Sequence, residues 1–293
     1  MEKYKVVILG AGISGMTSAI YLKRGGIDVL VIEDKIPGGV LNEIPSIENY
    51  PGYEEISGPD LAMNIYNQVT KLGIKILNKK ITSIDMNNKI INDNIKYEYL
   101  IIATGRKKRV LSLENEDKLL GKGISTCALC DGFFYKDKKV LVVGGGSSAL
   151  TDSLYLSNIC KEVILVHRKN KFTSEEYLIN KVNSTKNIKV LYNSNITKYN
   201  IDNNKLVSVV INNKDVLEID GIFLDIGSTP NSEIFNVNKE NNYILVDSNY
   251  MTNIDKVYAV GDVIKKDYYQ LSTATGDAVV ASSNIIKRVN SEK

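Results

Sequence analysis

Tyr4-Lys5-Val6-Val7-Ile8-Leu9-Gly10-Ala11-Gly12-Ile13-Ser14-Gly15 opens the chain with a predicted strand that leads directly into a glycine-rich turn. A helical stretch over residues 16–24 follows, and a second predicted strand over residues 28–32 ends on Glu33. The glycines permit a tight turn and the close approach of a pyrophosphate to the helix N-terminus. An acid after the second strand can accept a hydrogen bond from a ribose hydroxyl. The stretch therefore predicts a dinucleotide-binding unit.

The same pattern occurs a second time. A predicted strand over residues 138–143 leads into Gly144-Gly145-Gly146-Ser147-Ser148-Ala149, and a helix over 150–157 and a strand over 162–166 follow. His167-Arg168-Lys169 stands at the position that Glu33 holds in the first copy. An acid there repels a 2′-phosphate, whereas this run offers donors and positive charge. The first unit is predicted to bind FAD and the second NADPH, although the run would also suit a solvated surface.

Length and composition narrow the possible functions. The 293 residues, 43% of them apolar, suggest two domains with substantial cores. The net charge of +3, from 37 basic and 34 acidic residues, indicates neither a nucleic-acid surface nor a basic membrane face. Three cysteines are too few and odd in number for a secreted disulfide framework, so we expect a reducing cytoplasm. No apolar run reaches the length of a signal-peptide core or a membrane span.

A cysteine pair, Cys127-Ala128-Leu129-Cys130, lies between the two glycine loops, and Asp131 follows it. Two cysteines at this spacing can close a disulfide, and the geometry lowers the pKa of one thiol. Asp131 is the best candidate for a proton donor or acceptor beside the pair. The structural alternative is a zinc site that also uses Cys160 and His167, but the spacing matches no usual zinc pattern. Cys160 is expected to be a buried apolar residue.

Taken together, these motifs make the chain similar to the low-molecular-weight bacterial thioredoxin reductases over essentially its whole length. The position of the cysteine motif just ahead of the second glycine loop is the specific feature. The segments that carry the resemblance are Gly10 to Gly15, Glu48-Asn49-Tyr50-Pro51-Gly52, Ala103-Thr104-Gly105, Cys127 to Gly132, Gly144 to Ala149 and Gly261-Asp262-Val263.

The resemblance implies an α/β fold of two Rossmann-like, three-layer ββα domains, with an NAD(P)-binding domain inserted into an FAD-binding domain. Residues 1–109 and 241–293 would form the FAD domain, and residues 110–240 would form the NAD(P)H domain with the cysteine motif. A predicted strand over 257–260 and a helix over 276–288 would complete the FAD domain. Hinges are expected near residues 110–112 and 236–242. The resemblance also implies a homodimer.

The resemblance further implies which residues form the sites. Cys130 would face the flavin and Cys127 would attack the partner disulfide, while Asp131 is expected to move the proton because it lies beside the pair. No metal is expected. The expected flavin contacts are Gly10, Gly12, Ile13, Ser14, Gly15, Glu33, Gly38, Gly39, Val40, Asn49, Ala103, Thr104, Gly105, Gly261, Asp262, Val263, Tyr269, Gln270 and Leu271. The expected nicotinamide-nucleotide contacts are Gly144, Gly145, Gly146, Ser147, Ser148, Ala149, His167, Arg168 and Lys169.

The chain departs from the family pattern at several positions. Thr173 replaces the final arginine of the second basic cluster, so one phosphate ligand is lost or is replaced by Lys171. Val40 and Tyr269 replace a frequent Gln and a frequent Arg in segments that contact the flavin. The acidic pair that commonly follows the second glycine loop is Thr151-Asp152 here.

The leading hypothesis is a thioredoxin-disulfide reductase that passes electrons from NADPH through FAD and Cys127–Cys130 to thioredoxin or a thioredoxin-like protein. NADH is a possible donor. A ferredoxin-dependent flavin thioredoxin reductase is an alternative that keeps the flavin and the dithiol. A glutaredoxin-like or peroxiredoxin partner is another alternative, and a flavin-bound redox sensor is the non-enzymatic one.

Overall fold

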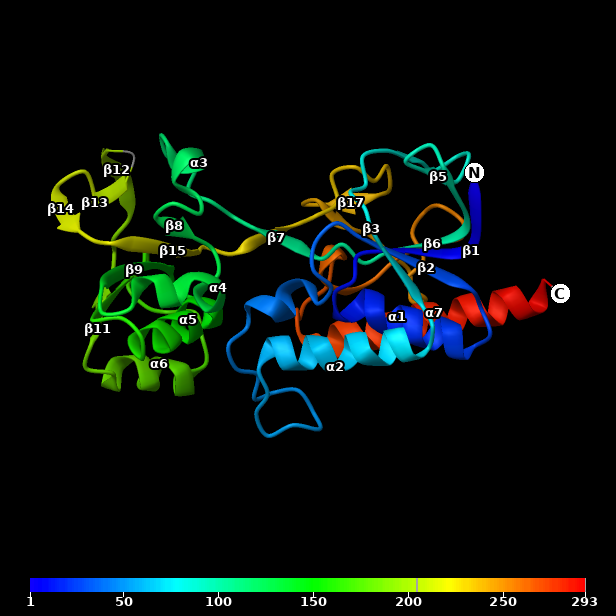
Figure 1. The fold of residues 1–293 in the computed structure, drawn as a ribbon, viewed down its shortest axis with the longest axis horizontal. Coiled ribbons are helices and arrows are strands. Elements are labelled where there is room, and N and C mark those ends of the chain that lie inside the picture. The colour runs from blue at the N-terminus through cyan, green and yellow to red at the C-terminus, as the bar shows by residue number, and fades with distance from the viewer. Residues whose placement is uncertain (204, 293) are drawn as a thin grey trace. The chain divides into compact units, whose positions relative to one another are not determined.

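The computed structural model describes residues 1–203 and 205–292. The chain forms two compact units, and the second is inserted into the first. The first unit comprises Met1–Lys107 and Thr229–Lys293, and the second comprises Lys108–Ser228. The chain crosses between them in strands β7 (Arg106–Lys108) and β16 (Ser228–Pro230), which pair with each other. Each unit is built on a largely parallel sheet with helices packed on it, which confirms the predicted α/β class (Figure 1).

These boundaries differ from the expected ones, most clearly at the second crossing, where the chain returns at residue 229 rather than 241. Long-range contacts explain the difference. Thr104 Oγ1 donates a hydrogen bond of 2.7 Å to the Asn231 carbonyl oxygen, and the Asn231 N–H donates one of 2.9 Å to the Gly105 carbonyl oxygen. Phe235 is 2% exposed within a core cluster of the first unit. The segment that was expected to act as a hinge, 236–242, therefore lies inside the first unit.

The first unit is organised around the opening strand β1. Among the described residues its sheet has seven strands in the order β3-β2-β1-β6-β5-β4, and β19 pairs with β6. β1 runs parallel to both β2 and β6, as expected for a nucleotide-binding unit. The strands are β1 (Glu2–Leu9), β2 (Val29–Glu33), β3 (Lys75–Asn78), β4 (Ile84–Asp85), β5 (Ile90–Ile91), β6 (Ile95–Ile102) and β19 (Val257–Ala259).

Both faces of this sheet are covered. Along β1, Val6 and Ile8 join the core on one face, while Val7 and Leu9 join the core on the other. This alternation is the consequence of a side-chain period of two in a sheet that is buried on both faces. Figure 1 shows α1, α2 and α7 together on one side of the sheet. The remaining elements are α1 (Ile13–Arg24), η1 (Gly39–Glu43), α2 (Gly58–Lys71), β17 (Lys239–Glu240), β18 (Tyr243–Ile244), η3 (Gly261–Val263) and α7 (Leu271–Ser291).

The second unit repeats the arrangement around β9. Its described residues form a five-stranded parallel sheet in the order β11-β10-β9-β15-β8 and a three-stranded antiparallel sheet in the order β12-β13-β14. The strands are β8 (Ile124–Ser125), β9 (Lys139–Gly144), β10 (Glu162–Val166), β11 (Ile188–Leu191), β12 (Ile196–Asp202), β13 (Lys205–Ile211), β14 (Asp215–Glu218) and β15 (Gly221–Asp225). The helices are α3 (Glu116–Leu119), α4 (Ala128–Asp131), η2 (Gly132–Tyr135), α5 (Ser147–Ser157) and α6 (Glu176–Ser184).

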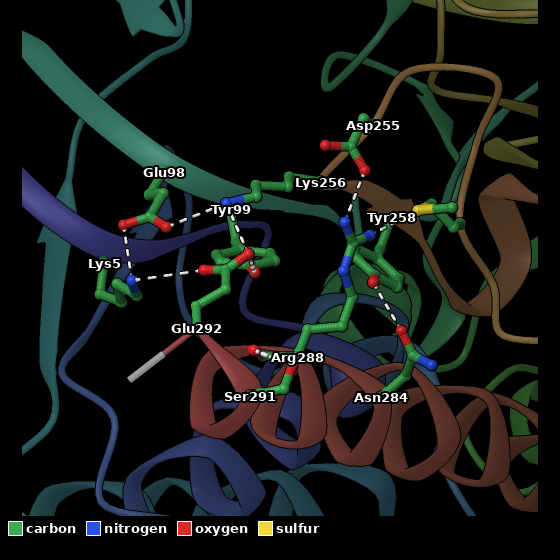
Figure 2. A network of polar contacts seen from close by, with 11 residues as sticks. Lys5, Glu98, Tyr99, Asp255, Lys256, Tyr258, Asn284, Arg288, Ser291 and Glu292 are labelled. Carbon is green, nitrogen blue, oxygen red and sulfur yellow. Dashed lines mark hydrogen bonds and ion pairs between the residues drawn. The ribbon is translucent and has the colours of Figure 1, made fainter.

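The C-terminal helix α7 is longer than predicted and is fixed at both ends. It begins at Leu271 because Gln270 and Thr273 form a reciprocal capping box. At its other end, Lys256 Nζ lies 3.1 Å from Glu98 and 2.8 Å from Glu292, which joins the helix to β6 (Figure 2). In residues 1–203 and 205–292, the structure contains no helix long and apolar enough to cross a membrane.

Candidate active site

The first glycine loop has the geometry of a pyrophosphate cradle. Gly10 has a φ of +103°, and a Cβ added there would lie 2.4 Å from the Ala103 carbonyl oxygen, so the turn requires glycine. Gly12 is different: it is the N-cap of α1, has a φ of −73°, and a Cβ there would meet no atom within 4 Å. The space beside Gly12 at the helix N-terminus is open, which fits the close approach of a diphosphate.

Glu33 lies beside this loop. One of its carboxylate oxygens accepts the Ala11 N–H at 2.7 Å and the other accepts the Lys35 N–H at 3.0 Å. Gly38 donates its N–H to the Ala11 carbonyl oxygen at 2.8 Å, which brings the segment from Gly38 to Val40 to the same loop. The positions that the sequence analysis assigned to the flavin thus meet at the carboxyl end of β1 and β2, where a Rossmann-like unit holds its nucleotide.

The returning segment reaches the same edge of the sheet. β19 pairs with β6 and leads into η3, where Gly261 lies so close to Ser14 that an added Cβ would be 2.3 Å from the Ser14 hydroxyl oxygen. Burial raises the pKa of Asp262, and the positive charges of Lys266 and Arg106 partly offset that effect. Asn49 Nδ2 donates to Gln270 Oε1 at 3.4 Å. These contacts involve three further segments of the expected flavin site, those that contain Gly261, Asn49 and Gln270.

Charged residues outside the expected flavin set also surround Asp262. Lys266 Nζ lies 2.8 Å from Asp277 Oδ2 and 3.8 Å from Asp262 Oδ1. The Arg106 guanidinium lies 4.7 Å from the centre of the Tyr269 ring. Arg106 directly follows the expected flavin segment Ala103-Thr104-Gly105. Its position in the sequence could therefore have identified it as a residue of the site. Lys266 and Asp277 carried no such signal, because only the fold brings them to η3.

The second glycine loop is held by the segment that follows β10. The Thr173 N–H donates to the Gly145 carbonyl oxygen at 2.7 Å, and Gly146 and Thr173 form a bridge. Ser147, the first residue of α5, donates its hydroxyl to Glu175 Oε2 at 2.7 Å. Thr173 therefore fixes the loop through its backbone, at the position where the family pattern has a phosphate-binding arginine.

His167 has a different environment from the one expected of a phosphate ligand. It is 7% exposed, its Nε2 lies 3.0 Å from the Lys171 carbonyl oxygen, and its ring packs directly on Gly145. Arg168 and Lys169 are exposed. These two residues of the expected cationic run present their side chains to solvent. The His167 ring instead packs against the glycine loop.

The redox pair lies in the second unit. Cys127 and Cys130 form a disulfide with a Cα–Cα distance of 5.3 Å, and Cys127 is the N-cap of α4. The Cys127 N–H donates to Ser125 Oγ at 3.0 Å, and the Cys130 N–H donates to Cys127 Sγ at 3.1 Å. An N–H aimed at Cys127 Sγ stabilises a thiolate on that sulfur once the disulfide is reduced. Asp131 is half-buried and ends α4.

The two cysteines differ in exposure. Cys127 is 8% exposed and Cys130 is exposed. The attack on a partner disulfide that the resemblance assigns to Cys127 therefore requires its sulfur to become accessible during the cycle. The buried third cysteine, Cys160, lies in the core of this unit, and burial raises its pKa to about 11. It is an apolar core residue, as expected.

The zinc alternative does not match the structure. Two of its four ligands are joined to each other as a disulfide, and Cys160 lies in the core. In the part of the chain that the structure describes, no group of three or more His, Cys, Asp and Glu residues could hold a metal ion.

Comparison with known proteins agrees with this arrangement. A family model described as pyridine nucleotide-disulphide oxidoreductase matches residues 4–278. The thioredoxin reductase of Ureaplasma parvum is 35% identical over 96% of this chain and 95% of its own length. That of Buchnera aphidicola from Acyrthosiphon pisum is 38% identical over 98% and 97%. The crystal structure of Lactococcus lactis thioredoxin reductase in the FR conformation is 34% identical, covers 98% of this chain and 99% of its own, and has a TM-score of 0.92.

Family membership implies a flavin and a pyridine nucleotide, and the two glycine-loop sites described above suit such ligands. The disulfide in the second unit supplies the redox centre that the family name requires. The chain therefore belongs to the pyridine nucleotide-disulphide oxidoreductase family and, within it, to the low-molecular-weight thioredoxin reductases.

Proposed function

We propose that this enzyme passes two electrons from NADPH through FAD to the Cys127–Cys130 disulfide and from there to thioredoxin or a thioredoxin-like protein. The observation that carries the proposal is the disulfide itself, which caps α4 in a unit that also contains a dinucleotide loop. The other unit contains the loop with Glu33. One chain thus combines two glycine loops of the nucleotide-binding type with a redox disulfide.

FAD is the proposed flavin of the first unit. Its diphosphate would lie at the open space beside Gly12, Glu33 would accept from the adenosine ribose, and Asp262 would bind the ribityl chain. The chemistry that a bound flavin would supply is hydride acceptance from the nicotinamide and transfer of two electrons to the disulfide. The raised pKa of Asp262 is consistent with a carboxyl group enclosed at a ligand site.

NADPH is the proposed donor at the second loop. Arg168 and Lys169 are exposed after β10, and Lys171 is exposed two residues further on. Three cations on one short segment suit a 2′-phosphate. His167 and Thr173 hold the loop rather than a 2′-phosphate. NADH is therefore the competing donor, and an anaerobic titration distinguishes the two.

The dithiol chemistry follows from the thiol environment. Two electrons and two protons convert the disulfide to two thiols, and Cys127, which receives the Cys130 N–H, loses its proton more readily. The Cys127 thiolate attacks one sulfur of the partner disulfide, and the partner's second sulfur leaves as a thiolate. Cys130 then attacks Cys127 Sγ, which restores the disulfide and releases the reduced partner. Asp131 is the proposed group that supplies and removes protons beside the pair.

The remaining features of the proposal rest on the family resemblance and on cysteine usage. A homodimer is the proposed assembly. The cytoplasm is the proposed compartment, because Cys160 is a free thiol in the core and the redox pair must cycle between its two states.

Anaerobic titration of the purified enzyme with NADPH, NADH and reduced ferredoxin tests the proposal directly. NADPH is expected to bleach the visible absorbance of the flavin, and oxidised thioredoxin added afterwards should restore it by accepting the two electrons. If reduced ferredoxin bleaches the flavin and neither nicotinamide does, the proposed donor is wrong. If the reduced enzyme transfers electrons to a glutaredoxin-like protein or a peroxiredoxin but not to thioredoxin, the proposed partner is wrong.

A further inference from the structure

A carboxylate lies at the end of the second glycine loop, where a dinucleotide would place its diphosphate. Glu175 Oε2 accepts the Ser147 hydroxyl at 2.7 Å and the Ser174 hydroxyl at 3.1 Å. Ser147 is the first residue of α5 and follows the N-cap Gly146. In a unit of this kind the diphosphate binds the free N–H groups of this first helical turn.

The carboxylate is held in this place by the chain around it. The Thr173 N–H bonds to the Gly145 carbonyl oxygen, so the segment that ends in Glu175 lies along the loop. The hydrogen bond from Ser147, the N–H of Glu175 itself and the bond from Ser174 lower the pKa of Glu175, so the group is ionised at neutral pH. Glu175 is also the N-cap of α6 but makes no side-chain cap hydrogen bond there. Its carboxylate therefore contacts Ser147 of α5 and the neighbouring Ser174, and it does not cap α6.

An ionised carboxylate at a helix N-terminus is stabilised by the helix dipole and the free N–H groups. A dinucleotide diphosphate needs the same dipole and the same N–H groups. Both anions cannot occupy that position at short range without strong repulsion. A bound diphosphate would therefore be repelled by Glu175 unless the carboxylate moved away from Ser147.

We propose that Glu175 is a built-in competitor for the diphosphate of the nicotinamide nucleotide and sets the affinity of this site. The inference rests on the proposed function, because it takes the second loop as the nicotinamide-nucleotide site. The ligand class is any dinucleotide with a diphosphate bridge. The competition acts on the diphosphate, which NADH and NADPH share, so it weakens the binding of both by the same factor.

The test is calorimetric binding of NAD⁺ and NADP⁺ to the oxidised, flavin-loaded enzyme and to Glu175→Gln. The amide removes the negative charge and keeps the shape of the side chain. Glu175 is exposed, as Glu176 is, so removal of this one like charge is expected to tighten the binding of both nucleotides by about 5-fold. Glu176→Gln is the matched control, because Glu176 is exposed, lies one residue further on and has the same charge. This control should leave both affinities unchanged.

A second comparison tests the geometry. In Ser147→Ala the hydroxyl that holds the carboxylate is gone, so adding Glu175→Gln should then improve affinity by much less than in the wild-type background. The proposal is overturned if Glu175→Gln leaves both affinities unchanged or weakens them. It is also overturned if only NADP⁺ binds more tightly, since Glu175 would then face the 2′-phosphate, or if the gain is equal in the Ser147→Ala background.

These measurements involve no electron transfer, so they separate this inference from the proposed function. If flavin bleaching shows that ferredoxin is the donor, a gain of nucleotide binding in Glu175→Gln still supports the competitor role. If neither the wild-type enzyme nor Glu175→Gln binds NAD⁺ or NADP⁺, the inference fails.

Discussion

Asp152 and Asp225 face each other inside the second unit with both carboxyl groups buried, at 7% and 8% exposure. Asp152 lies on α5, and Asp225 ends β15 beside the second glycine loop. Lys108 Nζ lies 3.2 Å from Asp225 Oδ1, so the carboxyl groups of Asp152 and Asp225 share one lysine charge. Asp152 also accepts the backbone N–H of Ala128, which lies between the redox cysteines. The pair therefore connects the nucleotide helix to the redox turn.

This pair predicts a pH-dependent stability. Burial, and then the charge and hydrogen bond of Asp225, raise the pKa of Asp152 from 3.8 to about 9. The folded protein therefore retains a proton that the unfolded chain releases above about pH 4. The unfolded state binds fewer protons over this window, so the free energy of unfolding should fall as the pH rises toward 9.

Asp152→Asn tests that prediction by denaturant unfolding at pH 5 and pH 9. The amide oxygen can still accept from Ala128, and the amide cannot ionise. The variant should lose part of the pH dependence and be more stable than wild type at pH 9. Asp215→Asn, an exposed change on β14, is the control and should follow the wild-type profile. Parallel profiles for wild type and Asp152→Asn would show that the pair holds no such proton.

The cluster at the end of α7 predicts a salt-sensitive contribution to stability (Figure 2). Lys256 binds Glu98 and Glu292, and its Nζ lies 4.8 Å from the centre of the Tyr99 ring. Lys256→Met should lower the Tm by a few degrees, because three contacts are lost at a largely covered cation. The loss should shrink in 1 M salt, where the screening length falls to about 3 Å.

Lys265→Met is the matched control for Lys256→Met. Within residues 1–203 and 205–292, the ion pair of Lys265 is with Glu240 alone, and both side chains are about half exposed. Such a pair contributes little to stability, so the control should leave the Tm nearly unchanged. Equal losses in the two variants would mean that the network adds nothing beyond ordinary surface pairing.

Local sequence patterns predicted most of the elements that build the sites. β10 has the predicted bounds, and α1, α5 and β9 differ by a few residues at their ends. Strand alternation and glycine turns are local properties, so a single sequence is enough to find them. The start of α7 was missed because Gln270 and Thr273 cap it ahead of the residues that first looked helical.

The features that the sequence could not predict depend on contacts between distant residues. Asp152 and Asp225 carry no local sign that they meet, and the return of the chain at residue 229 depends on the bonds between Asn231 and the Thr104-Gly105 segment. His167 was expected at the phosphate because it occupies the position that Glu33 holds in the first glycine-loop unit and opens a cationic run. The structure instead buries it beneath Gly145. A position in sequence does not reveal which way a side chain points.

The two redox cysteines predict different trapped products. In Cys130→Ser, Cys127 should still attack a partner disulfide, and the mixed disulfide should persist because no second thiol resolves it. In Cys127→Ser no such product should form. Both variants should lose thioredoxin reduction by several orders of magnitude, because they remove a nucleophile. Non-reducing electrophoresis and mass spectrometry identify the adduct.

Cys160→Ala is the control for these variants, since its thiol is buried and has a pKa of about 11. Turnover should be unchanged in this variant. If Cys127→Ser traps the partner and Cys130→Ser does not, the roles assigned to the two cysteines are reversed, which the greater exposure of Cys130 would then explain.

The glycine loop of the first unit allows its folding role to be separated from its binding role. Gly10→Ala forces a side chain into a φ of +103° and against the Ala103 carbonyl oxygen, so the apoprotein should lose about 1–3 kcal/mol of unfolding free energy or more. Gly12→Ala meets no atom within 4 Å, so the apoprotein should be as stable as wild type. Its methyl group would nevertheless fill the space proposed for the diphosphate, and the variant should purify with little flavin.

Flavin content and apoprotein unfolding, measured on both variants, give the comparison. If Gly12→Ala retained flavin at wild-type affinity, the diphosphate would have to bind elsewhere, since a cradle at the N-terminus of α1 has no room for both.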